Sequence, residues 1–570
     1  MNEKINLTEK SNMMNRELGR KVLEEFDEMT KIPMEINEKL LFKILKDNAN
    51  TEYGKKYGFK DIKSIEEYQQ KVPVIEYSDI ENYIERMKNG EKDILTAYSF
   101  DHMNETSGTT GKPKNIPLTV EQSQVFIKYN GQFPYGIIDK FIDSKWTKGK
   151  TFSPAEGKHI TLDSGITVGC AVSKMADLIK GDYEPYSSQF KSTFTSPAEA
   201  MVPGPEIDTK YIHVRFAMMD ESITGMVAPL LTNIAVLIKY LAINYETLIN
   251  DIEKGTIDSS ITLPEDIRES LLEKIEPMPE RAAELREIFK NGSEIEFMTL
   301  IWPNLKYIFA IGGGDLKEYN RFLRKCHNKT VHNLFSGVIA SEALISVPIY
   351  IDDLNSVLVP DSAFMEFLDV EYGDDFTKCV TMDKLEENKT YEIIVTTLNG
   401  LYRYRLSDAV KVTGFYNETR RIKFMYRVNK TINIAGEKTT EKMLRNVSRD
   451  ALKEFKLSLV DYAVYVDLSD IPGKYVFLLE TGRRENVDIS REELSKVLLE
   501  KLCEINPQYK WRHEIDRLGM PEVHFIKAGS QLMFRDWMIK QERATSQFKP
   551  VRILTTDEQK EFFNNLREDN

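Results

Sequence analysis

The sequence predicts an α/β protein with two domains, and three observations lead to this prediction. The chain has 570 residues, more than a single ordinary hydrophobic core accommodates. Short apolar runs typical of strands alternate with amphipathic stretches typical of helices along most of its length. This alternation starts afresh after about Thr431, so we place a large domain at residues 1–428 and a smaller α/β domain at 429–570.

The first hundred residues predict helices that are joined by short turns. Apolar residues fall at helical spacing in "NEKLLFKILKDNANTEYG", which begins at Asn37. The stretch "QQKVPVIEYSDIENYIERM" predicts a short extended piece and then a helix whose N-cap is Ser78.

The most apolar stretch of the chain, "MVAPLLTNIAVLIKYLAINY", begins at Met226. Its proline, asparagine and lysine favour a buried or pocket-lining helix over a membrane span. From about Ser259 to Phe297 the chain is rich in charge, and the i,i+4 pairs of "PERAAELREIF" predict a solvated helical face.

Strands are predicted in the second half of the chain. The apolar run "LKYIFAIGGGD" from Leu305 ends in glycines, which is typical of a buried strand that meets a tight loop. The segments "TYEIIVTTLNGLYRYRLSD" and "AVKVTGFYN" predict strands with a turn at Asn399 and Gly400. Further on, "DYAVYVDLSD" and "GKYVFLLET" predict a strand pair, and "SREELSKVLLEKLCEI" predicts the helix that follows.

Charge and cysteine content exclude several classes of protein. The formal net charge of −13 argues against a nucleic-acid partner, because phosphate backbones are bound by basic surfaces. The first residues have no apolar core of a secretory signal. The four cysteines and seven histidines show no metal-binding or redox spacing. We therefore expect a cytoplasmic protein with reduced thiols, no nucleic-acid partner and no membrane association.

The segment "ETSGTTGKPKNIPLT", from Glu105 to Thr119, concentrates phosphate-binding chemistry in one loop. Gly108 and Gly111 allow backbone N–H groups to approach an anion closely. Three hydroxyl and two ammonium groups add donors, those of Ser107, Thr109, Thr110, Lys112 and Lys114. The spacing fails the pattern G-x-x-x-x-G-K-[ST], which excludes a P-loop NTPase. Taken by itself, the loop leaves an ordinary polar turn open as the alternative.

The pattern T-S-G-T-T-G-x-P-K resembles the phosphate loop of the adenylate-forming (ANL) superfamily. Further segments follow in a fixed order: "IWPNLKYIFAIGGGD", "ASEALIS", "PDSAFMEFL", "YEIIVTTLNGLYRYRLSDAVKVTGFYN" and "SQFKPVR". Together with "NANTEYGKKYGF" and "TSPAEAM" they resemble the acyl acid amido synthetases, the amino acid-conjugating family first known from auxin-responsive plant genes. The resemblance covers nearly the whole chain, and we expect a bacterial-type member of this family.

This resemblance implies a particular form of the α/β fold. The large domain would hold sheets flanked by helices plus a small β-barrel. The smaller C-terminal α/β domain would be mobile, with a hinge near residues 427–433. Superfamily members turn this domain between two half-reactions, so that one site serves both steps.

The resemblance also implies ATP as cosubstrate and Mg²⁺ as metal ion. Glu342, in "ASEALIS", resembles the magnesium-binding glutamate of the family and, with Thr109, is assigned to catalysis. Asp408, in "YRYRLSD", matches the aspartate that holds the ribose hydroxyls. Lys549, in "SQFKPVR", resembles the C-terminal lysine that acts on ATP during adenylation. The implied nucleotide-binding set is Thr106, Ser107, Gly108, Thr109, Thr110, Gly111, Lys114, Gly313, Val338, Ser341, Glu342, Asp408, Arg427 and Lys549.

The helix after the loop, "VEQSQVFIKYNGQF", is expected to line the acyl pocket. Plant members commonly carry basic residues where this chain has Val125, Phe126 and Ile127, which favours an apolar acyl group. Amphipathic core packing explains the same residues without a substrate. The implied substrate-binding set is Val125, Phe126, Tyr129, Tyr211 and Gly337.

Two positions depart from the pattern of the family. Val338 stands where many members have an aromatic residue that packs on adenine, so stacking worth on the order of 1 kcal/mol is lost. Ser407 stands where members often have glycine. Both changes concern nucleotide binding, and neither removes a reacting group.

The predicted function is that of an AMP-forming ligase. It would adenylate a carboxylic acid, release pyrophosphate, and join the acyl group to the amine of an amino acid. Two alternatives stay open: transfer of the acyl group to a thiol such as coenzyme A, and a nucleotide-binding protein without turnover. A phosphotransferase is disfavoured by the failed P-loop spacing. The expected partners are a small carboxylic acid and an amino acid, and the expected oligomeric state is a monomer.

Overall fold

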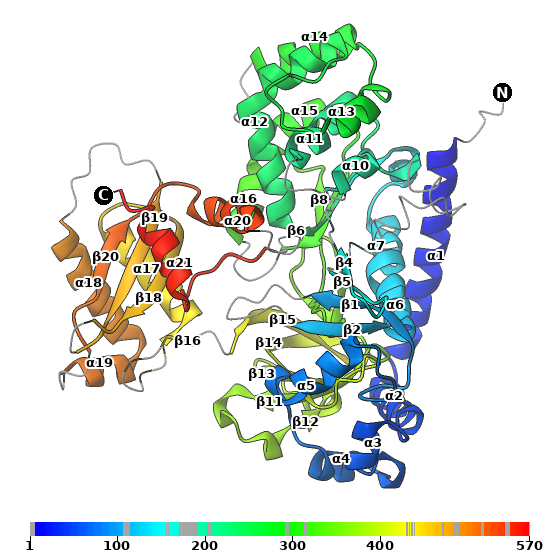
Figure 1. Cartoon of the computed structure of the whole chain (residues 1–570), viewed down its shortest axis with the longest axis vertical. Helices are drawn as coiled ribbons and strands as arrows, with labels where there is room; N and C mark the ends of the chain where they lie inside the picture. The colour runs from blue at the N-terminus through cyan, green and yellow to red at the C-terminus, as the bar shows by residue number, and fades with distance from the viewer. Residues whose placement is uncertain are drawn as a thin grey trace. The chain divides into compact units, whose positions relative to one another are not determined.

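Figure 1 shows a computed structural model of the chain, which describes residues 6–105, 114–154, 157, 159–169, 173, 192–201, 207–290, 296–312, 317–428, 431–432, 434, 437, 439–469, 472–482, 490–514, 518–541 and 548–568. The described residues up to Met425 form one compact unit, and those from Tyr426 onward belong to a second. Likewise, the hydrophobic cores of the two units consist of different residues.

The chain begins with helices, as predicted. Their bounds are α1 (Leu7–Met29), α2 (Pro33–Asp47), α3 (Glu52–Lys56), α4 (Ile65–Lys71) and α5 (Tyr77–Lys88). The prediction of Ser78 as an N-cap is wrong, because α5 already begins at Tyr77. The N-cap is Glu76, whose backbone N–H donates to the Asp79 carboxylate at 2.8 Å and so satisfies the start of the helix.

A four-stranded sheet, in the order β2-β1-β5-β4, carries the two ends of the predicted phosphate loop. The strands are β1 (Phe100–Glu105), β2 (Asn115–Thr119), β4 (His159–Thr161) and β5 (Thr167–Gly169). β1 and β2 are antiparallel, and Glu105 faces Asn115. This pairing therefore places the residues just before and just after the segment 106–113 next to each other.

One long helical stretch follows β2 and packs against α1. It consists of α6 (Val120–Phe126), a π-helical segment (Ile127–Gln132) and α7 (Phe133–Phe141). Figure 1 shows α7 running beside α1. Backbones approach closely there, because a Cβ atom built on Gly19 would lie 2.4 Å from the backbone nitrogen of Gly136.

A second, wholly parallel sheet has the order β3-β6-β7-β8. Its strands are β3 (Thr151–Phe152), β6 (Gly225–Leu230), β7 (Tyr307–Ile311) and β8 (His332–Phe335). β7 confirms the strand predicted in "LKYIFAIGGGD". Helices that share its core are α10 (Ala198–Met201), α11 (Thr209–Met219), α12 (Leu231–Lys254), α13 (Glu265–Leu272), α14 (Pro279–Lys290), α15 (Phe297–Ile301) and α16 (Lys317–Cys326).

The prediction of one helix in the apolar stretch from Met226 is wrong. The structure has the strand β6 there, followed by the helix α12. An all-apolar run does not distinguish a buried strand from a buried helix. Here residues 225–230 pair with β7, and the Asn233 side chain accepts a hydrogen bond from the backbone of Leu230 at 3.1 Å, where α12 starts. None of the helices in the described ranges is long and apolar enough to cross a membrane.

A third, antiparallel sheet of seven strands has the order β12-β11-β13-β14-β15-β10-β9. Its strands are β9 (Ser346–Pro348), β10 (Ser356–Leu358), β11 (Phe364–Asp369), β12 (Val380–Thr381), β13 (Thr390–Thr396), β14 (Tyr404–Tyr416) and β15 (Thr419–Arg427). The predicted turn lies between β13 and β14, with Gly400 at a φ of +86°. This sheet stands where a small β-barrel was expected, but its edge strands β12 and β9 are not paired with each other in the described chain.

The second unit is an α/β structure with its own core. β18 (Leu459–Asp467) and β19 (Lys474–Thr481) form the predicted antiparallel pair, and β20 (Glu522–Phe525) joins β19 in parallel. α18 (Arg491–Ile505) is the predicted helix. The remaining elements are β16 (Thr431–Ile432), β17 (Thr439–Thr440), α17 (Glu441–Glu454), α19 (Pro507–Glu514), α20 (Ser530–Lys540) and α21 (Asp557–Asn564).

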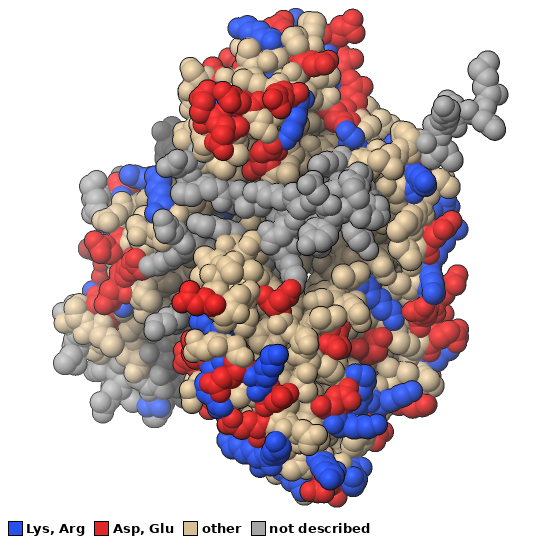
Figure 2. Space-filling model, turned by 45° about the vertical axis from the view of Figure 1, so that its right-hand side comes forward, with Lys and Arg blue, Asp and Glu red and all other residues tan. Residues whose placement is uncertain are grey.

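One face of the molecule is shown with its charges in Figure 2. Acidic and basic side chains are interspersed over its lower part, and acidic side chains prevail near the top. The described residues on this face therefore form no continuous basic surface of the kind that binds a phosphate backbone. The absence of a nucleic-acid partner stays a prediction.

Candidate functional site

Glu342 lies at the tip of a tight hairpin between β8 and β9. The Ala340 N–H donates to the Ala343 carbonyl at 2.9 Å, so Ser341 and Glu342 form a two-residue tip. Gly337 allows the hairpin to close, because a Cβ atom built on it would lie 1.9 Å from the carbonyl oxygen of Ser346. No side chain larger than hydrogen fits at this position without moving the backbone.

Two asparagine side chains hold the tip of this hairpin. Asn104, near the end of β1, donates from Nδ2 to the Ser341 carbonyl at 3.4 Å. Asn399, from the turn after β13, donates to the Glu342 carbonyl at 3.3 Å and accepts from the Thr119 backbone N–H at 3.1 Å. The hairpin tip is thereby tied to both strands that flank the segment 106–113. Sequence reasoning missed both asparagines, since neither belongs to a recognisable motif.

The Glu342 side chain is buried, with 8% of its surface exposed. Among the residues that the structure describes, its carboxylate forms no hydrogen bond or ion pair. Its oxygens are not among the enclosed, unpaired atoms of the described chain, so water or a cation can reach this mostly buried acid. The described residues contain no cluster of three or more potential metal ligands. Mg²⁺ fits such a site, because it is held by one or two carboxylates together with phosphate oxygens and waters.

Lys114 is the first described residue after the segment 106–113 and directly precedes β2. Its ammonium group donates to the Tyr404 hydroxyl at 3.3 Å and lies 5.7 Å from the ring centre of Tyr77 and 5.8 Å from that of Tyr404. Aromatic faces attract a cation in this arrangement. Lys114 thus stands at the start of β14, the strand that carries Asp408.

Asp408 is buried in β14, within a β-bulge that lies between Arg405 and Ala409. The pairing of β13 and β14 shifts there, and Ser407 takes a φ of +60°. A positive φ is strained for residues with a Cβ atom and free for glycine. Glycine would therefore adopt this backbone conformation without the strain that Ser407 carries.

Substitutions at Ser407 should follow this backbone geometry. Ser407→Gly is expected to fold with a thermal midpoint close to that of the parent protein. Ser407→Val is expected to destabilise by about 1–3 kcal/mol, because a β-branched residue is poorly accommodated at positive φ. Thermal unfolding followed by circular dichroism compares the two. Equal midpoints for both variants would contradict the strain assigned to Ser407.

The arginines of "YRYR" form buried ion pairs. Arg403 contacts the Glu366 carboxylate at 2.9 Å, and Arg405 contacts that of Glu392 at 2.6 Å. Burial alone would lower the pKa of Arg403, but the attraction of Glu366 outweighs it and leaves the pKa raised. Glu366 lies in β11 and Glu392 in β13, whereas Arg403 directly precedes β14 and Arg405 belongs to it. These arginines therefore stabilise the start of the strand that carries Asp408.

The helix predicted to line the acyl pocket contains the π-helical segment. Val125 and Phe126 are half-buried at its start. Tyr129 is buried, and its hydroxyl donates to the Asp361 carboxylate at 2.5 Å. Burial, and then the negative charge of Asp361, raises the pKa of Tyr129, so the hydroxyl stays protonated and acts as a donor. π-Helical segments often mark functional sites.

Tyr211 lies elsewhere, in the core between α11 and α12. Its hydroxyl donates to Asp251 at 2.6 Å and accepts from Arg215 at 3.1 Å. These partners satisfy the hydroxyl within that core, and no described contact joins Tyr211 to Glu342 or Val125. Its role in substrate binding stays a prediction.

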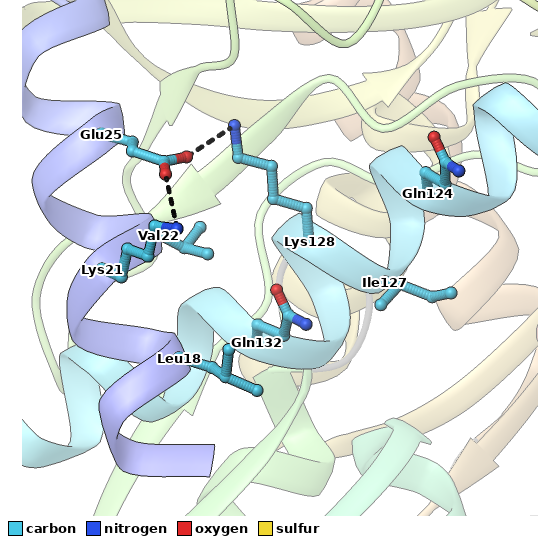
Figure 3. A pocket seen from close by; sticks show the side chains of 8 residues that line it. All are labelled: Leu18, Lys21, Val22, Glu25, Gln124, Ile127, Lys128 and Gln132. Atoms are coloured by element: carbon cyan, nitrogen blue, oxygen red, sulfur yellow. Dashed lines mark ion pairs between the residues drawn. The ribbon is translucent and has the colours of Figure 1, made fainter. Parts of the chain in front are cut away.

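A surface groove of about 300 Å³ lies between α1 and the π-helical segment. Figure 3 shows Glu25 between Lys21 and Lys128, and both lysines form ion pairs with it. The groove is lined by Leu18, Lys21, Val22, Glu25, Gln124, Ile127, Lys128 and Gln132. It therefore contains none of the predicted substrate-binding set, whose helical members Val125, Phe126 and Tyr129 occupy other positions on the same helix.

Several predicted residues lie outside the described part of the chain. These are Thr106, Ser107, Gly108, Thr109, Thr110, Gly111, Gly313 and the side chain of Arg427. Val338 is buried at the base of the hairpin, where its N–H donates to the Ser346 hydroxyl at 2.8 Å. Lys549 is exposed and belongs to the second unit. The roles of all these residues stay predictions.

Comparison with known proteins identifies the family. Residues 22–331 match the "GH3 family N-terminal domain", 356–427 the "GH3 family central domain" and 442–558 the "GH3 family C-terminal domain". The chain is 28% identical over 567 residues to "Indole-3-acetic acid-amido synthetase GH3.4" of Arabidopsis thaliana, with 94% of this chain and 92% of the relative covered. It is 29% identical to "Probable indole-3-acetic acid-amido synthetase GH3.11" of Oryza sativa subsp. japonica, with 94% of each covered.

A solved structure of "GH3.15 acyl acid amido synthetase" has the same fold. Its TM-score is 0.82 at 25% identity, and 96% of each chain is covered. The predicted α/β fold, with a large N-terminal and a smaller C-terminal domain, is thereby confirmed. These curated relatives are plant proteins, so the expectation of a bacterial-type member finds no support. Because the N-terminal domain alone matches more than half of its length, the chain belongs to the GH3 family.

Proposed function

We propose that this chain is an ATP-dependent acyl acid amido synthetase. It adenylates a carboxylic acid, releases pyrophosphate, and joins the acyl group to the amine of an amino acid. The observation that carries the proposal is the position of Glu342, an unpaired acid at a hairpin tip whose backbone carbonyls are held by Asn104 and Asn399, beside the strands that flank the segment 106–113. Membership of the GH3 family over most of the chain supports the same reaction.

The adenylation step places particular demands on the site. The acid's carboxylate oxygen attacks the α-phosphorus of ATP, and the bond to pyrophosphate breaks. Negative charge moves onto the leaving group, so the site must neutralise charge more than perform covalent chemistry. Glu342 would hold Mg²⁺, which neutralises phosphate charge when bound. Lys114 and the donors of 106–113 would bind the phosphates, Asp408 the ribose and Val338 the adenine.

The second step forms the amide. The nitrogen lone pair of the amino acid attacks the acyl carbon, the bond to the AMP oxygen breaks, and the amine loses a proton. We assign Lys549 to the adenylation step. A turn of the domain 429–570 about a hinge near 427–433 would then open the site to the amine. Closure would also shield the adenylate from water.

An apolar acid suits the residues near the predicted acyl pocket. Val125 and Phe126 are half-buried, and the Tyr129 hydroxyl is occupied by Asp361. This wall therefore presents no positive charge from these three positions. The plant relatives are named for indole-3-acetic acid, an aromatic acid, and we propose an aromatic or fatty acid for this chain.

We further propose a monomeric, cytoplasmic protein that acts on small molecules. Among the described residues, Cys326, Cys379 and Cys503 are free thiols. Burial raises the pKa of Cys326 to about 11 and that of Cys379 to about 12, so both stay protonated and unreactive. Reduced, buried thiols of this kind support a reducing compartment.

Product analysis tests the proposed acceptor. The purified protein is incubated with ATP, Mg²⁺ and a panel of aromatic and fatty acids, with either mixed amino acids or coenzyme A. We expect AMP and an N-acyl amino acid, detected by mass spectrometry, only when acid and amino acid are both present. An acyl thioester in place of the amide would show a thiol acceptor. ATP binding without either product would show a nucleotide-binding protein without turnover.

A further inference from the structure

Asn104 is a buried side chain whose amide is only half satisfied. It is 1% exposed, and its Nδ2 donates to the carbonyl of Ser341. Its Oδ1 is enclosed and accepts no hydrogen bond from any described residue. Buried polar atoms in folded proteins nearly always have a partner, so this oxygen calls for an explanation.

Asn399 provides a comparison within the same hairpin contact. It too donates to a carbonyl of the tip, that of Glu342, but its Oδ1 accepts from the backbone of Thr119. Both the donor and the acceptor of its amide are therefore satisfied within the fold. Asn104 makes the equivalent contact to Ser341, but its Oδ1 receives no hydrogen bond from a described residue.

The group that would satisfy Asn104 can be inferred from its surroundings. Ser341, which Asn104 contacts, is followed directly by Glu342, whose buried carboxylate also lacks a partner among the described residues. A neutral acceptor and an anionic one thus belong to Asn104 and to the residue that follows its contact in the chain. Their complement is a group that carries positive charge and presents several O–H donors. Hydrated Mg²⁺ has both properties, because it retains several of its waters when bound.

We propose that Asn104 is a positioning residue of the magnesium site: its Oδ1 accepts a hydrogen bond from a water of the Mg²⁺ that Glu342 would hold. The inference rests on the proposed function, since that function requires Mg²⁺ with ATP. Hydrogen-bond partners outside the ligands themselves orient a metal site, and their loss typically costs about 10–100-fold in metal affinity.

Three variants separate the acceptor from the structural contact. Asn104→Leu removes the whole amide at similar volume. Asn104→Asp removes the Nδ2 donor but keeps acceptor oxygens. Asn37→Leu is the matched control, because Asn37 is fully buried and donates to the carbonyls of Pro360 and Ala363 at 2.8 and 2.7 Å, neither of which belongs to the hairpin tip. If Asn104→Leu does not fold, Asn104→Ala replaces it.

The measurement is ATP binding by isothermal titration calorimetry, first in EDTA and then over a series of Mg²⁺ concentrations. For Asn104→Leu we expect unchanged ATP binding in EDTA and about a tenfold or greater rise in the Mg²⁺ concentration needed for half-maximal enhancement. Asn104→Asp should stay near the parent protein. Asn37→Leu should lose thermal stability without a change in Mg²⁺ dependence.

Three results would overturn the inference while leaving the proposed function in place. The first is an Asn104→Leu variant with the Mg²⁺ dependence of the parent. The second is an Asn104→Asp variant as impaired as Asn104→Leu, since the contact to Ser341 would then be the cause. The third is weaker ATP binding already in EDTA, which would place the amide on the nucleotide. A parent protein that binds no ATP at any Mg²⁺ concentration would overturn the proposed function, and with it this inference.

Discussion

Glu342→Gln is expected to lower acid-dependent ATP–pyrophosphate exchange by about 10²–10³-fold, the cost of losing a preorganised charge-stabilising group. Glutamine keeps the size of the side chain and removes the negative charge that would hold Mg²⁺. The fold should not suffer, because the carboxylate has no described partner to lose. Removing a buried, unpaired charge should instead leave the thermal midpoint unchanged or raise it.

Glu386→Gln is the control for this variant. Glu386 is largely exposed and pairs with Lys389 on the surface, so its replacement should change neither exchange nor thermal midpoint. A Glu342→Gln protein with exchange near the parent level would remove Glu342 from the reaction. A strongly destabilised Glu342→Gln protein would show a structural role for the carboxylate.

The largest effect on stability is expected at Glu366, which pairs with Arg403 inside the seven-stranded sheet. Both side chains are at most 4% exposed, and two further hydrogen bonds of Arg403 go to the carbonyls of Gln69 and Val72. Glu366→Ala leaves the guanidinium buried without its counter-charge. Breaking a buried pair in this way costs about 3–5 kcal/mol, measured as a shift of the urea or thermal unfolding transition.

Two comparisons test the cause of that loss. Glu366→Met combined with Arg403→Met should be more stable than Glu366→Ala, because no unpaired charge remains. Glu28→Gln, which removes the exposed pair with Lys31, should have no measurable effect. If Glu366→Ala unfolds like the parent protein, the Arg403 guanidinium finds other partners and the pair does not hold the sheet.

The sequence predicts a strand correctly when the residue pattern that marks the strand is local. The runs that became β7, β18 and β19 combine apolar or alternating residues with glycine or polar ends, and these signals act within a few residues. The stretch from Met226 was misread because its pairing partner, β7, lies about eighty residues further on. Likewise, the N-cap is Glu76 and not Ser78, because the Asp79 carboxylate accepts a hydrogen bond from the Glu76 N–H.

The residues of the candidate site also differ in whether a local pattern predicts them. Glu342 and Asp408 could be named from sequence because each belongs to a motif. Asn104 and Asn399 could not, since their contacts to the hairpin tip join residues 237 and 57 positions apart. The strain at Ser407 could not be predicted from the sequence either, because its positive φ depends on a bulge that only the pairing of β13 and β14 creates. Motifs thus predict candidate groups such as Glu342 and Asp408, and only the fold shows the asparagines that contact the hairpin tip.

The most direct test of the account is ATP–pyrophosphate exchange by the unmodified protein, with Mg²⁺ and with or without each acid of an aromatic and fatty acid panel. We predict label exchange that requires Mg²⁺ and one class of acid, and that is absent when the acid is omitted. ATP binding without exchange, whichever acid is supplied, would contradict the proposal that this chain adenylates a carboxylic acid.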